Sequence, residues 1–175
     1  SVALLLASYS SSLASHIVGA DMYYTYVSGL TYKITVVLYG DCGPSSAAAF
    51  STLSSPTAAP SICIFNGPTL VTNITLPLQA PTAGVEITPV CPAYVNSTQC
   101  TNTSFATPGI KKFVYSANYT LPTTSANWRF VFNGNYGPSS GGRAAAITNL
   151  AGGSTIQLID TLNNTTSPNT SPLLT

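Results

Sequence analysis

Few side chains in this chain are suited to acid–base or nucleophilic chemistry. The carboxylates number four (Asp21, Asp41, Glu86 and Asp160), and His16 is the only histidine. A glycosidase needs two carboxyl groups that face each other across a cleft, and the wide spacing of these four along the sequence favours solvated carboxylates instead. One histidine cannot build a metal site alone. We therefore expect His16 to be a hydrogen-bonded residue near the start of the domain, and we expect neither a metal nor a cofactor.

One short motif is similar to a catalytic one. Residues 137–141 read Gly-Pro-Ser-Ser-Gly and match the Gly-x-Ser-x-Gly pattern of hydrolase nucleophile elbows, with Ser139 as the nucleophile. That fold needs an acid and then a histidine downstream of the serine, whereas the only histidine here lies far upstream. A Gly/Ser-rich turn explains these residues fully, so the sequence predicts a protein that is not an enzyme.

The cysteines predict disulfides rather than a metal or redox site. Cys42, Cys63, Cys91 and Cys100 form an even set without Cys-x-x-Cys spacing. Disulfides persist in oxidising compartments, so the set predicts a secreted, extracellular or cell-surface protein. Four cysteines allow three pairings. The short separation of Cys91 and Cys100 favours a bond between them, with Cys42 bonded to Cys63, and the other pairings stay open.

Charge is unusually sparse in this chain. Charged residues make up 5% of it and the net charge is +1, whereas roughly a quarter of the residues in a soluble domain are charged. Such a surface gives little repulsion between copies and is typical of glycosylated or assembled proteins. Five basic residues are too few to expect nucleic acid binding. No apolar run reaches the roughly 18 residues of a membrane span, so none is expected.

Alternating apolar residues predict a β-rich fold. Between Tyr32 and Cys42, the side chains of Ile34, Val36 and Leu38 fall on one side of an extended chain, as in a half-buried strand. Strands are expected over residues 21–27, 31–39, 61–65, 69–78, 84–88, 111–121, 127–132 and 154–162. A long loop is expected over residues 45–60 and an irregular excursion over residues 89–107. Together these features predict an all-β, immunoglobulin-like sandwich of about seven to nine antiparallel strands.

The two ends of the chain differ from its middle. Residues 1–14 combine the apolar Val2, Leu4, Leu5 and Leu6 with small residues and resemble the end of a secretory signal peptide. If retained, the segment is expected to be an extended arm that donates a strand to the next copy, or that folds back on its own domain. Residues 15–162 are expected to form the sandwich. Residues 163–175 are polar and of low complexity, which is typical of a tail, a linker or a docking strand.

Several residues are candidates for glycosylation or for binding sugars. The Asn-x-Ser/Thr acceptor pattern occurs at Asn73, Asn96, Asn102, Asn118, Asn163, Asn164 and Asn169. Thr161, within Asp160-Thr161-Leu162, matches the O-glycosylation acceptor of Bacteroidetes. Tyr23, Tyr24 and Tyr26 offer rings that can stack against sugars, although tyrosines at such spacing more often pack across strands.

Two segments resemble the start of large secreted surface proteins of Bacteroidetes. Residues 15–24 read Ser-His-Ile-Val-Gly-Ala-Asp-Met-Tyr-Tyr, and residues 38–42 read Leu-Tyr-Gly-Asp-Cys. The family opens with a Ser-His-Ile-Val-Gly-Gly-Glu-like motif and a strand that ends Tyr-Arg-Asp-Cys. It includes gliding-motility-associated and adhesin-like proteins exported by the type IX system. This chain departs from the pattern at Asp21, where Glu is usual, and at Gly40, where Arg is usual, so a salt bridge to Asp41 is not expected.

The resemblance implies a surface structural or adhesive module with no catalytic residues to carry over. We therefore expect a non-enzymatic extracellular subunit of a bacterial fibre or adhesin, whose partners are copies of itself joined by strand addition. The alternative expectation is a glycan-binding module at the head of a larger adhesin.

Overall fold

The computed structural model describes residues 17–43, 53–55, 59–134, 141 and 156–172. The sequence-based expectations for the arm at Val2, Leu4, Leu5 and Leu6, for His16 and for Ser139 fall outside these residues. Among the helices in the described part of the chain, none is long and apolar enough to cross a membrane.

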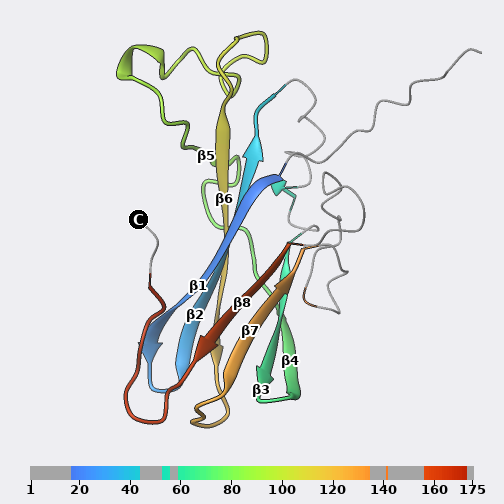
Figure 1. The fold of residues 1–175 in the computed structure, drawn as a ribbon, viewed down its shortest axis with the longest axis vertical. Helices are drawn as coiled ribbons and strands as arrows, with labels where there is room; N and C mark the ends of the chain where they lie inside the picture. The colour runs from blue at the N-terminus through green and yellow to red at the C-terminus, as the bar shows by residue number, and fades with distance from the viewer. Residues whose placement is uncertain (1–16, 44–52, 56–58, 135–140, 142–155, 173–175) are drawn as a thin grey trace, which may run out of the picture.

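The described residues form two four-stranded antiparallel sheets that pack face to face (Figure 1). The strands are β1 (Ile17–Ser28), β2 (Thr31–Asp41), β3 (Ser61–Asn66), β4 (Thr69–Thr75), β5 (Val85–Glu86), β6 (Ile110–Thr120), β7 (Trp128–Asn133) and β8 (Gln157–Leu162). One sheet has the order β1-β2-β6-β5, and we call it the first sheet. The second sheet has the order β4-β3-β7-β8. The predicted all-β sandwich is thus confirmed.

The strand order is that of an immunoglobulin-like domain. In that fold, strands A, B, E and D form one sheet and strands C, F and G form the other. The order β1-β2-β6-β5 corresponds to A-B-E-D, and β3, β7 and β8 correspond to C, F and G, with β4 added beside β3. The disulfide that joins strands B and F in antibody domains has no counterpart here, and the buried Trp128 lies on β7 instead of on the third strand.

The β1–β2 hairpin and β6 form the long part of the first sheet. β1 and β2 are connected across Gly29, whose φ of 54° is a conformation that glycine adopts without steric cost. β2 then pairs with β6 along its whole length, from Thr31 opposite Thr120 to Asp41 opposite Ile110. Ile34, Val36 and Leu38 are fully buried, as the alternation predicted, but β2 is central and Thr35 and Val37 on its other face are buried too, so the expectation of a half-buried strand is wrong for residues 34–38.

The core lies between the two sheets. Trp128, Phe130 and Phe132 of β7 are 0% exposed and face the apolar side chains of β2 and β6. Tyr24, Tyr32 and Phe130 make ring contacts at one side of this core, with centroids 5.8 Å apart for the two tyrosines and 5.5 Å apart for Tyr24 and Phe130. Large aromatic side chains bury the most area per residue, so this cluster anchors the sandwich.

Candidate functional site

A disulfide fastens the upper end of the sandwich, as Figure 1 is drawn. Cys42 directly follows β2, and its partner Cys100 lies in the β5–β6 connection (residues 87–109), with 4.8 Å between the two Cα atoms. The Cys42 N–H also donates to the Gly109 carbonyl at 2.9 Å. A Cβ on Gly109 would lie 2.6 Å from the Cys100 sulfur, so only glycine allows this close approach.

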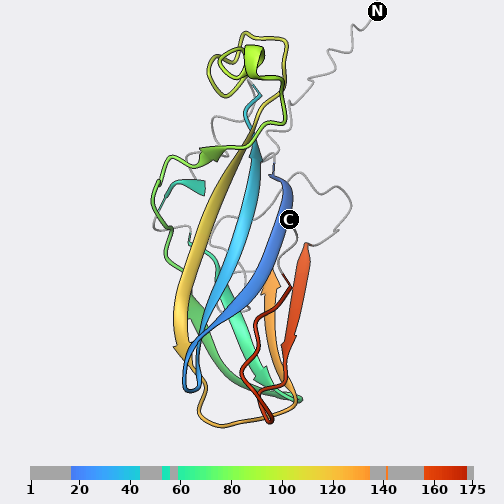
Figure 2. The same ribbon diagram turned by 90° about the vertical axis from the view of Figure 1, so that its left-hand side faces the viewer.

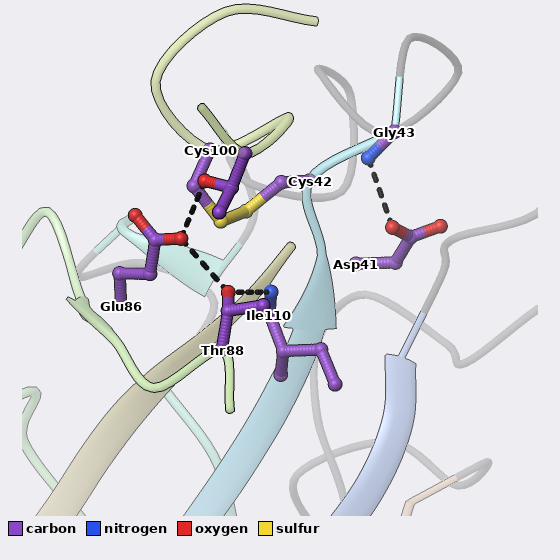
Figure 3. Close-up of a disulfide and its surroundings, with 8 residues drawn as sticks. Asp41, Cys42, Gly43, Glu86, Thr88, Cys100 and Ile110 are labelled. Atoms are coloured by element: carbon purple, nitrogen blue, oxygen red, sulfur yellow. Dashed lines mark hydrogen bonds between the residues drawn. A yellow bond between two sulfur atoms is a disulfide. The ribbon is translucent and has the colours of Figure 1, made fainter. Parts of the chain in front are cut away.

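Hydrogen bonds around Glu86 tie the same connection to the first sheet (Figure 3). One carboxylate oxygen, Oε1, accepts from the hydroxyls of Thr88 and Thr98. The Thr88 hydroxyl in turn accepts from the Ile110 N–H at 3.0 Å, where β6 begins. The Glu86 carboxylate therefore fastens the connection at Thr88 and Thr98, the disulfide at Cys100, and the Cys42 N–H at Gly109.

The observed disulfide corrects the pairing that the sequence favoured. Cys42 bonds to Cys100, whereas Cys63 and Cys91 are free thiols. Cys63 is buried on β3 and cannot meet Cys42, which is carried past the end of β2 to the connection. Burial raises the pKa of the Cys63 thiol and so disfavours the reactive thiolate. Sequence proximity misled the prediction because residues 87–109 fold back over the end of β2.

The β5–β6 connection also displays apolar side chains to solvent. Tyr94 is 57% exposed, Val95 48% and Phe105 37%. Two of the candidate glycosylation sites, Asn96 and Asn102, are exposed on the same connection. An exposed apolar group on a loop that is fixed at both ends is a common arrangement for a binding loop on a rigid scaffold.

The three tyrosines that were candidates for stacking against sugars do not form one platform. Tyr24 is 3% exposed and lies in the core, where its hydroxyl donates to the Thr161 carbonyl and to Asn169 Oδ1, both at 3.1 Å. Burial, with Asp160 nearby, raises the pKa of Tyr24 to about 12. Tyr26 packs edge-on against Tyr32 on that same side of β1. For Tyr24 the packing interpretation that the sequence favoured thus describes the structure, and its candidacy for sugar stacking ends, because alternation along β1 turns it inward.

Tyr23 lies on the opposite, outer face of the first sheet. There the Tyr39 hydroxyl donates to Asp21 Oδ2 at 2.6 Å. Burial and the Asp21 hydrogen bond raise the pKa of Tyr39 to about 12, and Tyr23 is close enough to contribute. The outer face thus carries two neighbouring tyrosine side chains beside a carboxylate.

The C-terminal segment, which we define as residues 163–172, lies against the sandwich. It runs between β1 and β8 in the direction opposite to β1 (Figure 2). The Ser171 hydroxyl accepts from the Tyr24 N–H at 2.6 Å and donates to the Tyr24 carbonyl, and the Ser171 N–H donates to that carbonyl at 3.0 Å. Thr170 accepts from the Tyr26 N–H. Residues 163–172 therefore pack against β1 through hydrogen bonds, although they form no assigned strand.

Beyond the contacts with the C-terminal segment, several apolar residues of β1 and around β8 are only partly buried. Ala20 and Met22 of β1, together with Ile156 and with Leu158 of β8, pack against the core but are only partly buried. Because the Tyr24 N–H points away from β2, alternation directs the N–H groups of Ala20 and Met22 to the same outer side. No acceptor among the described residues bonds to them. We call this region, defined by Ala20, Met22, Ile156 and Leu158, the β1 slot.

The four carboxylates are engaged separately in local structure. Asp21 accepts from Tyr39, Glu86 from two threonines, Asp41 from the Gly43 N–H at 2.9 Å, and Asp160 from the Thr161 N–H at 2.9 Å. Burial raises the pKa of Asp160. No group of three or more His, Cys, Asp or Glu side chains in the described ranges has an arrangement that could hold a metal ion.

The candidate glycosylation sites separate by exposure. Asn73, Asn96, Asn102, Asn118, Asn163, Asn169 and Thr161 are exposed. Asn164 is 7% exposed, and its Oδ1 accepts from the Ser125 N–H at 2.8 Å. The folded chain has no room for a glycan on this amide, so the prediction for Asn164 is wrong.

Comparisons of the chain with protein-family models, with curated proteins and with solved structures found no match.

Proposed function

We propose that this chain is a non-enzymatic, extracellular structural module, a subunit of a bacterial cell-surface fibre or adhesin that assembles by β-strand contacts. The observation that carries the proposal is the β1 slot. Among the described residues, the Ala20 and Met22 N–H groups of this edge strand have no acceptor, and the apolar side chains that define the β1 slot are partly buried. An added strand satisfies such backbone groups and covers such side chains at the same time.

The C-terminal segment supports this reading of the edge. It already lies along the neighbouring part of β1. There the Ser171 and Thr170 hydroxyls accept from the Tyr24 and Tyr26 N–H groups, and the Ser171 N–H donates to the Tyr24 carbonyl. The β1 edge is therefore suited to accept an extended segment. Residues 1–14 of a second copy, with the apolar Val2, Leu4 and Leu6 at alternate positions, match an occupant whose side chains enter the slot. The low charge of the chain does not oppose stacking of copies.

The test compares assembly of the 175-residue chain with that of two variants, by light scattering and electron microscopy. Met22→Pro removes a backbone N–H from the β1 edge, which would receive the added strand. Leu4→Asp/Leu6→Asp places charges in residues 1–14, the segment that would be added. Since the Met22 N–H takes no part in the β1–β2 ladder, the proline variant is expected to keep the fold, which circular dichroism and thermal unfolding check.

The wild type is expected to form linear oligomers, and both variants are expected to remain monomeric. A wild-type chain that stays monomeric at high concentration, or a folded Met22→Pro variant that assembles equally well, would contradict the proposal.

A second candidate function, glycan binding, is favoured by the outer face of the first sheet. Tyr23 and Tyr39 lie near each other there beside Asp21, and an aromatic face with a carboxylate suits a sugar ring and its hydroxyls. A glycan array probed with the monomeric chain and with Tyr23→Ala tests it. Saturable binding that the substitution removes favours this second function, whereas no binding eliminates it.

A further inference from the structure

A pocket of about 440 Å³ opens on the second sheet, near the β3–β4 turn. Its lining includes Gly67, Pro68, Ala126, Asn127, Arg129 and Thr161. The volume is within the range of roughly 300–1,000 Å³ that is usual for small-molecule sites. It lies on a different sheet from Tyr23 and away from the β1 slot, so neither proposed function accounts for it.

Arg129 is held rigidly at this pocket. Its Nη2 donates to the Gly67 carbonyl at 3.1 Å, and its guanidinium carbon lies 5.0 Å from the centre of the Phe65 ring. Phe65 is its neighbour across β3 and β7. No carboxylate in the part of the chain that the structure describes forms an ion pair with Arg129. The guanidinium is thus positioned by two contacts, and most of its N–H groups stay available.

Two uncharged polar side chains accompany this cation. Thr161 is the direct cross-strand neighbour of Arg129 in the β7–β8 pair. Asn127 precedes β7, and its backbone carbonyl is fixed by the Gly67 N–H at 2.9 Å. Within the described residues, neither the Thr161 hydroxyl nor the Asn127 side-chain amide has a hydrogen-bond partner. The pocket therefore presents a guanidinium, a hydroxyl and an amide from backbone positions that are hydrogen-bonded into the sheet.

We propose that this pocket binds a carboxylate-bearing sugar, such as a uronic acid residue. The planar guanidinium fork matches a carboxylate through two parallel N–H···O bonds. The Thr161 hydroxyl and the Asn127 amide, which both donate and accept, match the ring hydroxyls of a sugar. Pro68 and Ala126 add an apolar surface for the C–H face of the ring. The proposal does not depend on strand assembly, because one chain contains the whole pocket.

The test is calorimetric titration of the 175-residue chain, produced without glycosylation and kept below the concentration at which it assembles, with digalacturonate as the probe. The neutral disaccharide galactobiose and a short acidic peptide serve as comparison ligands. Digalacturonate is expected to bind saturably and to bind more weakly as salt increases, because a partly exposed ion pair is screened. Galactobiose is expected to bind at least about tenfold more weakly, since a charge-assisted hydrogen bond to the carboxylate is lost.

Variants place the binding at Arg129. Arg129→Gln is expected to weaken digalacturonate binding by about 10- to 100-fold, and Arg129→Lys by about tenfold, because lysine keeps the charge but not the fork. Thr161→Val provides a second variant that leaves the Arg129–Phe65 contact intact. Lys33→Gln, which removes one exposed charge from the first sheet, is the matched control and is expected to change nothing.

Absence of digalacturonate binding, equal binding of galactobiose, or tighter binding of the acidic peptide would each overturn the proposal. So would an equal loss of binding in Lys33→Gln and Arg129→Gln.

Discussion

Removing the Cys42–Cys100 disulfide should destabilise the fold strongly. The bond closes a loop with a sequence separation of 58 residues. In the chain-entropy model a loop of that length removes about 14 cal/mol/K from the unfolded state, which is about 4 kcal/mol at 25 °C. Since small domains are stable by only about 5–15 kcal/mol, Cys42→Ala/Cys100→Ala should lose a large part of the total. Cys91→Ala should cost little, because this thiol is free and exposed.

Urea unfolding monitored by Trp128 fluorescence measures the loss of unfolding free energy in Cys42→Ala/Cys100→Ala and in Cys91→Ala. Thiol labelling independently checks which cysteines are paired. The native chain should react at one thiol, Cys91, and the unfolded, unreduced chain at two, Cys63 and Cys91. A cost below about 1 kcal/mol for the double substitution, judged against the 2–4 kcal/mol that is typical, would refute the reasoning. So would a comparable cost for Cys91→Ala, or a chain without free thiols.

Three further substitutions test local features of the structure. Ser171→Ala should cost about 1 kcal/mol and speed hydrogen exchange at the Tyr24 amide, because it removes that amide's acceptor; unchanged exchange would contradict the docking. Asp160→Asn should flatten the pH dependence of the melting temperature. Burial raises the pKa of Asp160 in the folded chain above its pKa in the unfolded chain. Wild-type stability is therefore highest at pH values below the unfolded-state pKa and falls as pH rises through the folded-state pKa. Parallel curves of melting temperature against pH for the two proteins would argue against this. Gly109→Ala should destabilise by about 1–3 kcal/mol, since its Cβ would lie 2.6 Å from the Cys100 sulfur, and an unchanged urea midpoint would show that the connection can move aside.

Several strands could be predicted because their core-facing residues alternate with other residues. Along β2 the alternation of Ile34, Val36 and Leu38 marks the buried face directly, and Trp128, Phe130 and Phe132 mark the facing strand. Both sets lie between the sheets as expected, and the strand boundaries differ from the prediction by a few residues. Local periodicity is sufficient when one face of a strand meets the core and the other meets solvent.

The cysteine pairing and the candidate sites could not be predicted from local periodicity, because they depend on contacts between segments that are distant in the sequence. Cys100 reaches Cys42 only because the β5–β6 connection folds back over the end of β2. Tyr24 was a candidate for sugar stacking as well as for packing, and the sequence does not indicate that Ser171, 147 residues later in the chain, bonds its backbone. The pocket at Arg129 combines residues from β7, β8 and the β3–β4 turn, and no sequence spacing indicates that they meet.

Hydrogen exchange at the Ala20 and Met22 amides tests strand assembly at the β1 slot most directly. Both N–H groups point outward from β1 and have no acceptor among the described residues, whereas the Tyr24 amide is bonded to Ser171. In the monomer, Ala20 and Met22 should exchange quickly while Tyr24 is protected. In the assembled protein, all three should be protected, because a strand from a neighbouring copy then bonds the upper edge of β1. Assemblies in which Ala20 and Met22 still exchange at the monomer rate would contradict assembly through this edge.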